Sequence, residues 1–244
     1  MSEVHFSSTT WDIELRSGPA QTLFDETAER LRSFASGPMS VGHSVSGRCI
    51  RILTVDSPAV VLGSSQKDPG GLAVPTVRRR SGGGAVWLSN ALLWFDIFIP
   101  KDDPLWRDDI SRSMWWVGQF VANALTKEGL TGLHVHRGAM LRVPGSGTVC
   151  WLGTGPGEVV VRNAHTVAKV VGIAQRRTRH AALFQVGVAL RPSQFQLGGL
   201  FDIDPNVIEA SEPPIGLAAP GVSRALDRDR LVASAIASLP DWSM

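Results

Sequence analysis

One long helical pattern stands among short apolar segments that come in pairs, and this order restricts the fold more than any other feature. The pattern covers residues 108–128, where Asp109 or Ser111 can cap the start and Gly129 ends it. Its apolar residues recur on one face: Met114, Val117, Val121 and Leu125. Because the strand-like segments do not alternate regularly with helices, the sequence predicts an α/β fold with a mixed β-sheet flanked by helices.

The segments around this helix are predicted to form strands and two further helices. The expected strands are residues 50–53, 59–62, 85–88, 92–100, 159–161, 166–174 and 182–190, and the expected helices are residues 21–34 and 224–239. Two hairpins are expected, one around Ser89 and Asn90 and one joining residues 159–161 to residues 166–174. Apolar residues at every second position from 95 to 99 indicate a strand with one buried face.

Composition and charge exclude several classes of protein. The net charge of +2 gives no reason to expect a nucleic acid partner. No apolar segment is long enough to span a bilayer, and residues 1–12 lack the basic start and apolar core of a signal peptide. Cys49 and Cys150 form neither a disulfide framework nor a zinc pattern. We therefore expect a cytoplasmic protein with reduced thiols and no membrane partner. Residues 1–244 are expected to form one domain with a short helical tail at about 221–244 and no accessory domain.

A glycine-rich segment after three arginines is the strongest chemical signal in the chain. It reads Arg78-Arg79-Arg80-Ser81-Gly82-Gly83-Gly84-Ala85. Consecutive glycines let backbone N–H groups approach a ligand and form an anion-binding nest, and arginines can donate to phosphate or carboxylate groups. The segment lacks the Gly-Lys-Ser/Thr of a P-loop and the spacing of a dinucleotide-binding turn. A flexible turn beside a solvated basic patch is the alternative interpretation.

Lys169 stands among apolar residues on a predicted strand. Because a buried ammonium group is costly unless it meets an anion, Lys169 is predicted to contact a bound carboxylate or phosphate. An exposed lysine on an edge strand is the alternative. Cys150 is either a buried, inert thiol or a nucleophile that a nearby cation activates. His134 and His136 lack a third ligand, so no metal site is predicted.

Taken together, these motifs resemble the lipoate–protein ligase A family, within the superfamily of biotin and lipoate protein ligases and octanoyl and lipoyl transferases. The resemblance covers roughly residues 21–191. Its motifs are Thr22-Leu23-Phe24-Asp25-Glu26, Leu62-Gly63-Ser64-Ser65-Gln66, the glycine-rich segment, and Lys169-Val170-Val171-Gly172-Ile173-Ala174-Gln175. The resemblance implies the catalytic domain fold of the biotin and lipoate ligases.

The resemblance also implies which residues form the site. Substrate and cofactor are expected against Arg79, Arg80, Ser81, Gly82, Gly83, Gly84, Ala85, Gly172, Ala174 and Gln175. Lys169 is expected to be catalytic, because the corresponding lysine contacts the carboxyl or acyl-phosphate group in the family. The chain departs from many relatives at residues 87–91, where they carry His-Asp and Gly-Asn, and at Val167-Ala168, where they carry Gly-Arg.

Three functions are compatible with these motifs. The first is a ligase that uses ATP and Mg²⁺ to attach a lipoyl or octanoyl group, through an acyl-adenylate, to a lysine of a lipoyl carrier domain. Its acceptors would be 2-oxoacid dehydrogenases or the glycine cleavage H protein. The second is a cofactor-free transferase in which Cys150 takes an octanoyl group from acyl carrier protein. The third is a non-catalytic lipoate-binding relative.

Overall fold

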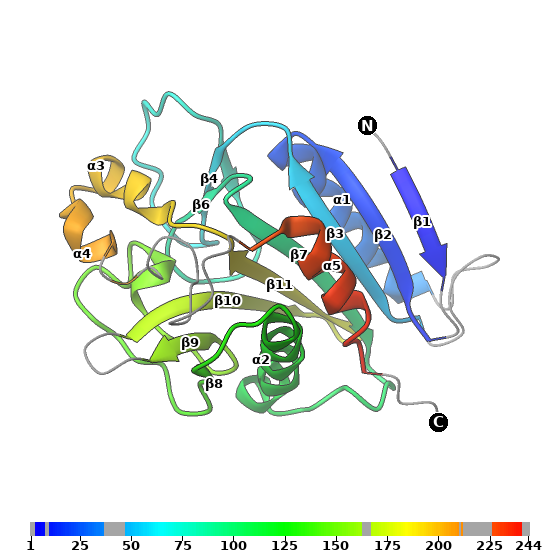
Figure 1. Ribbon diagram of the computed structural model, residues 1–244. Helices are drawn as coiled ribbons and strands as arrows, with labels where there is room; N and C mark the ends of the chain where they lie inside the picture. The colour runs from blue at the N-terminus through cyan, green and yellow to red at the C-terminus, as the bar shows by residue number, and fades with distance from the viewer. Residues whose placement is uncertain are drawn as a thin grey trace.

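A sheet of eight strands forms the centre of the molecule (Figure 1). The computed structural model describes residues 3–7, 10–36, 47–162, 167–209, 211 and 226–240. The strand order is β1 (Glu3–Ser7), β2 (Asp12–Gly18), β3 (Cys49–Val55), β7 (Leu92–Pro100), β11 (Ala181–Ala189), β10 (Val167–Arg177), β9 (Val159–Arg162) and β8 (Leu133–Val135). Strands β2 and β3 run parallel, and the other neighbouring pairs in this order are antiparallel. The predicted mixed α/β fold is therefore confirmed.

A second, smaller sheet lies beside the first. Its three strands are β5 (Thr76–Arg78), β4 (Ala59–Leu62) and β6 (Val86–Leu88), with β4 in the middle. Strand β4 runs parallel to β5 and antiparallel to β6. The apolar residues of β4 are fully buried, and they pack with Leu53, Leu92 and Trp94 of the main sheet in one hydrophobic cluster. Residues of both sheets line a cavity that forms part of the candidate site.

Helices cover both faces of the main sheet (Figure 1). The helical elements are α1 (Ala20–Ser33), η1 (Phe34–Ser36), α2 (Ile110–Lys127), η2 (Cys150–Leu152), η3 (Gln194–Leu197), α3 (Gly198–Phe201), α4 (Pro205–Glu209) and α5 (Arg228–Ile236). Helices α2 and α5 share one buried cluster with Phe95 and Ile97 of β7, and α1 packs on the opposite face with the small sheet. In the described part of the chain, no helix combines the length and apolar character that a membrane span requires.

Several predictions from periodicity are confirmed. The long pattern forms α2, and Asp109 is its N-cap, with a carboxylate that accepts from the amide of Arg112 at 2.9 Å. Residues 21–34 correspond to α1, and β9 and β10 form the second expected hairpin. Helix α5 is shorter than predicted, and residues 221–225 and 241–244 of the expected tail lie outside the described residues.

The expected hairpin around Ser89 and Asn90 is wrong. The turn itself is present, because the amide of Leu92 donates to the carbonyl of Ser89 at 3.0 Å. However, β6 pairs with β4 in the small sheet, whereas β7 pairs with β3 and β11 in the main sheet. The turn therefore carries the chain from one sheet to the other.

The prediction that β7 has a single buried face is also wrong. Eight of its nine residues are buried, because α2 and α5 cover one face while α1 and the small sheet cover the other. Residues Leu93, Phe95, Ile97 and Ile99 face α2 and α5, and Leu92 and Trp94 face the small sheet. Strand β7 is thus the central support for everything built on either face.

One carboxylate lies in this buried strand. Asp96 is fully buried and accepts hydrogen bonds from the hydroxyl of Thr27, from Trp94 Nε1 at 2.8 Å and, more weakly, from Gln185 Nε2 at 3.5 Å. Burial raises the pKa of Asp96 to about 6, although these hydrogen bonds and the nearby guanidinium of Arg51 favour the charged form. Because Trp94 and Gln185 also line a cavity, this network connects α1 to the candidate site.

A carboxyl group with a raised pKa binds its proton more tightly in the folded protein than in the unfolded chain. The free energy of unfolding should therefore fall as the pH rises through the window from about 4 to about 6. The variant Asp96→Asn should lose this fall, and the two pH profiles should diverge by at most about 3 kcal/mol between pH 4 and pH 7. Urea unfolding at a series of pH values measures the difference. Parallel profiles would contradict the prediction.

Candidate active site

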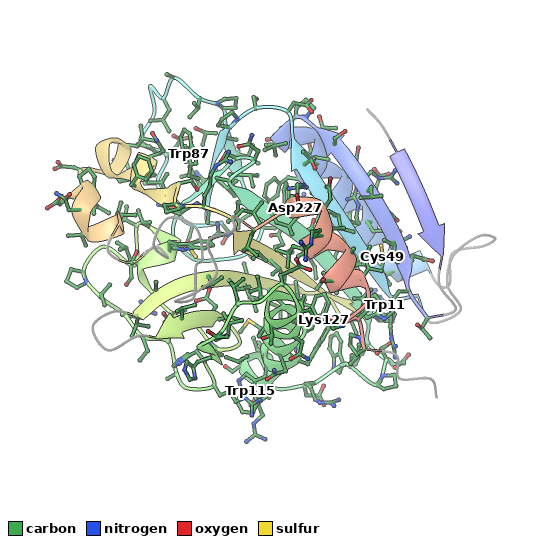
Figure 2. The ribbon with its side chains drawn as sticks, in the orientation of Figure 1. Trp11, Cys49, Trp87, Trp115, Lys127 and Asp227 are labelled. Carbon is green, nitrogen blue, oxygen red and sulfur yellow. The ribbon has the colours of Figure 1, made fainter. Side chains whose placement is uncertain are left out.

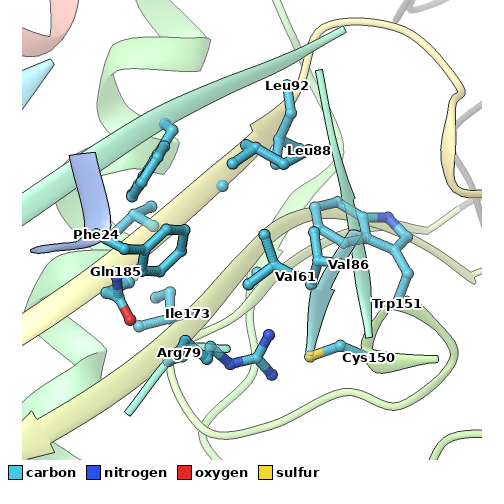
Figure 3. A pocket seen from close by; sticks show the side chains of 15 residues that line it. Phe24, Val61, Arg79, Val86, Leu88, Leu92, Cys150, Trp151, Ile173 and Gln185 are labelled. Carbon is cyan, nitrogen blue, oxygen red and sulfur yellow. The ribbon is translucent and has the colours of Figure 1, made fainter. Parts of the chain in front are cut away.

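An apolar cavity lies between the small sheet, α1 and the main sheet. Apart from Arg79, Cys150 and Gln185, the side chains that line it are apolar or absent: Phe24, Val61, Val86, Leu88, Leu92, Trp94, Trp151, Gly172, Ile173, Ala174, Val186 and Gly187. Figure 3 shows Cys150 and Arg79 at one end of this cavity, with Leu88 and Leu92 at the other. Such walls favour an apolar ligand or the apolar part of one.

A polar cavity adjoins the apolar one at Cys150. The residues that line it are Ser65, Gly82, Gly83, Gly84, Ile110, Met114, Met140, Arg142, Ser146, Gly147, Cys150, Gly153, Glu158, Lys169, Ile173, Ala174 and Gln175. Cys150, Ile173 and Ala174 line both cavities. A molecule with an apolar chain and a charged head can therefore place each part in matching surroundings.

The glycine-rich segment pairs directly with the segment that carries Cys150. The amide of Ala85 donates to the carbonyl of Thr148 at 2.6 Å, and the amide of Cys150 donates to the carbonyl of Ala85 at 2.9 Å. This approach requires a glycine at position 84, since a Cβ atom there would lie 2.7 Å from Thr148 O and 2.8 Å from Cys150 N. The two motifs, about 65 residues apart in sequence, thus form one backbone ladder.

The buried side chain of Arg79 holds the glycine-rich loop in its conformation. Its Nη2 donates to the carbonyls of Gly82 at 2.9 Å and Gly84 at 2.8 Å. The amides of Gly82, Gly83 and Gly84 donate to no acceptor within the described part of the chain. The guanidinium therefore holds the carbonyls of Gly82 and Gly84, and the amides of the three glycines, which line the polar cavity, are of the kind that can form an anion-binding nest.

The other predicted loop residues differ in exposure. Arg80 is exposed, and its carbonyl accepts from Arg176 Nη1 at 2.9 Å. Ser81 is buried, and its hydroxyl donates to Gln185 Oε1 at 3.3 Å. Ala85 is fully buried in the ladder. None of these three residues lines either cavity: Ser81 and Ala85 are buried next to lining residues, and Arg80 lies at the surface.

Lys169 is buried and ion-paired, with 3% of its side chain exposed, so it is not an exposed edge-strand lysine. Its Nζ donates to Glu158 Oε2 at 2.8 Å and to the carbonyl of Cys150 at 2.8 Å, and it lies 5.5 Å from the centre of the Trp151 ring. Lys169 sits where the β9–β10 register shifts. The ammonium group thereby fixes the Cys150 segment to β10.

Glu158 is a site residue that the sequence reasoning missed. Its Oε2 also accepts from the amide of Gly155 at 2.6 Å, and its Oε1 accepts from the amide of Ile173 at 3.1 Å. One signal was present, because Glu158 is the sole acidic residue between Gly129 and Lys169 and directly precedes an apolar strand. The predicted contact of Lys169 with a bound anion stays a prediction, since the nearest anion in the protein is this carboxylate.

The remaining predicted residues lie along β10. A Cβ at Gly172 would lie 3.1 Å from the Trp151 ring, so glycine lets the ring close the apolar cavity. Ala174 lines both cavities. The side-chain amide of Gln175 is hydrogen-bonded over 3.0 Å to the Ser113 hydroxyl of α2. Along β10, therefore, Gly172 lines the apolar cavity, Gln175 lines the polar cavity and Ala174 lies where the two meet.

The two cysteines differ in their surroundings. Cys150 is partly exposed and lines both cavities. Cys49 is fully buried beside Glu14, and burial raises the pKa of its thiol, so it is the inert one of the pair.

The family model and the solved structures that match this chain agree with one another. The family model described as lipoyl protein ligase A/B catalytic domain matches residues 40–223. A lipoate-protein ligase A structure bound with ATP has a TM-score of 0.63 at 19% identity, covering 93% of this chain and 82% of that one. Protein Ta0514 of T. acidophilum, with bound lipoic acid, has a TM-score of 0.62 at 15% identity, covering 91% of this chain and 81% of that one.

A third structure is a bi-partite lipoate protein ligase from Thermoplasma acidophilum, reported with its E2 lipoyl domain. Its TM-score is 0.62 at 15% identity, and the match covers 94% of this chain and 81% of that one. None of the curated protein sequences matches this chain. At these identities the structures show a shared fold.

The backbone ladder between the glycine loop and the Cys150 segment can be tested with two alanine variants. Gly84→Ala should lower the free energy of unfolding by about 1–3 kcal/mol, because the new methyl group overlaps backbone atoms. Gly82→Ala is the control, since no atom lies within 4 Å of its Cβ position, and its stability should stay unchanged or rise slightly. Urea unfolding of both variants measures this, and equal stabilities would show that the close approach is absent.

Proposed function

The chain belongs to the lipoyl protein ligase A/B catalytic domain family and is an enzyme of that class, and we propose that it attaches a lipoyl or octanoyl group to a lysine of a lipoyl carrier domain in an ATP-dependent reaction. The observation that carries this proposal is the junction at Cys150 of an apolar cavity with a polar cavity, which is lined by Lys169 and by three glycines whose amides donate to no acceptor among the described residues. An acyl chain and its carboxylate need such opposite surroundings.

The apolar cavity suits the acyl chain. Its walls come from Phe24 of α1, from Val61 and Val86 of the small sheet, and from Ile173 and Val186 of the main sheet. Burial of each methylene group stabilises binding by about 0.8 kcal/mol. The chain would lie with its carboxylate toward Cys150, because that end meets the polar cavity. The lipoic acid bound to Ta0514 is consistent with this class of ligand.

The polar cavity fits the phosphates of ATP. The amides of Gly82, Gly83 and Gly84, with the cations of Lys169 and Arg142 in the same wall, are donors of the kind that bind phosphate. A protein cage for Mg²⁺ does not fit, because the described residues contain no group of three His, Cys, Asp or Glu side chains suited to a metal. Magnesium would therefore be held largely by the nucleotide phosphates and water.

In this reaction the nucleotide supplies the leaving group that activates the acyl carboxylate. The three amides and Lys169 would stabilise the negative charge that develops while the carboxylate oxygen bonds to the α-phosphorus and pyrophosphate departs. Glu158 holds the ammonium of Lys169 in position at 2.8 Å. The acceptor lysine then bonds through its amine to the acyl carbon, AMP leaves and the amine loses a proton. The same donors would hold the oxyanion of that step.

A second candidate is a transferase, and the place of Cys150 favours it. The thiol lies at the junction where an acyl carbonyl would stand. The sulfur would bond to the carbonyl carbon of octanoyl carrier protein and release the carrier thiol, and the acceptor lysine would later displace the sulfur. This route needs no ATP. The carrier domain is the acceptor in both routes, as the reported pairing of the Thermoplasma ligase with its E2 lipoyl domain suggests.

The two routes are distinguished by the mass of an acceptor. A lipoyl domain of a 2-oxoacid dehydrogenase is incubated with the protein and either lipoate, ATP and Mg²⁺ or octanoyl carrier protein. The ligase proposal expects one lipoyl group on the domain with lipoate and ATP, and no transfer from octanoyl carrier protein. Cys150→Ala should retain most of this activity, because the adenylate route needs no enzyme nucleophile.

The opposite pattern would replace the ligase by the transferase. It consists of an octanoyl adduct on the wild-type protein that is absent in Cys150→Ser, together with ATP-independent modification of the domain. No modification of the domain from either donor would overturn both proposals.

A further inference from the structure

Exposed apolar side chains gather at the mouth of the polar cavity. Of the seven large apolar residues that are exposed in the described part of the chain, four line this cavity or adjoin a residue that lines it: Ile110 at 60%, Leu141 at 51%, Met140 at 52% and Val143 at 48%. Ile110 and Met140 also line the cavity itself. Exposed apolar residues that gather in this way often mark an interaction surface.

Arginine and tryptophan continue the same surface over the outer side of α2. The guanidinium groups of Arg112 and Arg137 lie 5.8 Å and 5.7 Å from the centre of the Trp115 ring. Figure 2 shows Trp115 at the outer side of α2. Trp115 and Arg137 also line a groove with Trp116 and Phe120. Aromatic, methionine and arginine side chains are enriched at the centres of protein interfaces.

The segment that carries this surface is held in place by backbone hydrogen bonds. The amide of Leu141 donates to the carbonyl of Thr154 at 2.8 Å, and the amide of Thr154 donates back at 3.0 Å. His136 Nε2 is bonded to the carbonyl of Ala139 at 2.7 Å. The apolar side chains are therefore exposed on a fixed backbone, which lowers the entropic cost of binding a partner.

The positive charge of residues 129–157 favours an acidic partner, whereas Arg112 on α2 is paired with Asp109 at 3.7 Å. From Gly129 to Gly157 the chain contains Arg137 and Arg142 and no acidic residue. Both arginines are exposed and form no salt bridge within the described residues. An acidic protein surface complements them and would be steered toward them.

We infer that this surface, formed by Ile110, Arg112, Trp115, Arg137, Met140, Leu141, Arg142 and Val143, docks the acceptor carrier domain through an acidic surface of that domain. The inference rests on the proposed function for the identity of that partner. Because Ile110, Met140 and Arg142 line the polar cavity, a domain seated here brings its lysine to the cavity that Cys150 and Lys169 also line. The docking surface thus selects the acceptor before any chemistry occurs.

The test measures binding separately from acyl transfer. The full-length protein is titrated calorimetrically with the unmodified lipoyl domain of a 2-oxoacid dehydrogenase at low and high salt. Wild-type protein should bind, with a Kd that rises with salt. Arg137→Glu should raise the Kd at least about ten-fold, because it reverses an exposed charge of the surface. Arg32→Glu makes the same charge change on the exposed side of α1, which covers the other face of the sheet, and should leave the Kd unchanged.

The outcome separates this inference from the proposed reaction. Weaker binding by Arg137→Glu alone supports the docking surface whether or not acyl transfer is detected. Equal affinities of the wild type and Arg137→Glu, equal losses in both variants, or no binding of the lipoyl domain would overturn it. Binding of a mixed RNA that depends on Arg137, without binding of the domain, would likewise overturn it.

Discussion

A buried ion pair between Lys169 and Glu158 is the interaction on which the candidate site depends. Only 3% of the Lys169 side chain and 4% of the Glu158 side chain are exposed. So deeply buried an ion pair stabilises the fold only when good geometry and further hydrogen bonds offset the loss of hydration of both charges. Glu158 meets this condition through the amides of Gly155 and Ile173, and Lys169 meets it through the carbonyl of Cys150. The pair therefore fixes the loop before β9, the strand β10 and the segment of Cys150 relative to one another.

The glycine loop joins this arrangement through backbone contacts. Ala85 pairs with the segment that ends at Cys150, and Arg79 holds the loop carbonyls from the inside. Three motifs that lie far apart in the sequence therefore meet at one residue, Cys150, where the apolar and polar cavities join. The surface proposed for the carrier domain adds a third requirement, access for a lysine from the outside, at the rim of the same polar cavity.

Local patterns in the sequence predicted the helices and most of the strands, because α2 and α1 carry their own periodicity and Asp109 its own cap. Sheet membership could not be read in this way. Ser89 and Asn90 indicate a turn, but whether the next strand pairs with β6 or with β3 and β11 depends on distant segments.

The site also contains features that the sequence predicted and features that it did not. The glycines, Cys150 and Lys169 were identified by residue type and motif, and the structure brings them together. Glu158 could not be predicted because its role follows from the register between β9 and β10. Arg79 lines the apolar cavity, but the sequence could not show that its guanidinium also binds the carbonyls of Gly82 and Gly84. A motif gives the residues, and their partners come from the packing of the whole chain.

A double-variant cycle on the ion pair tests this account most directly. Lys169→Met should lower the free energy of unfolding by about 3–5 kcal/mol, because it leaves the Glu158 carboxylate buried without its partner. Combining it with Glu158→Gln should restore much of that stability without restoring acyl transfer to the lipoyl domain. Denaturant unfolding and intact-mass analysis of the acceptor measure the two effects. A Lys169→Met variant with wild-type stability and full transfer would contradict the central place of the pair.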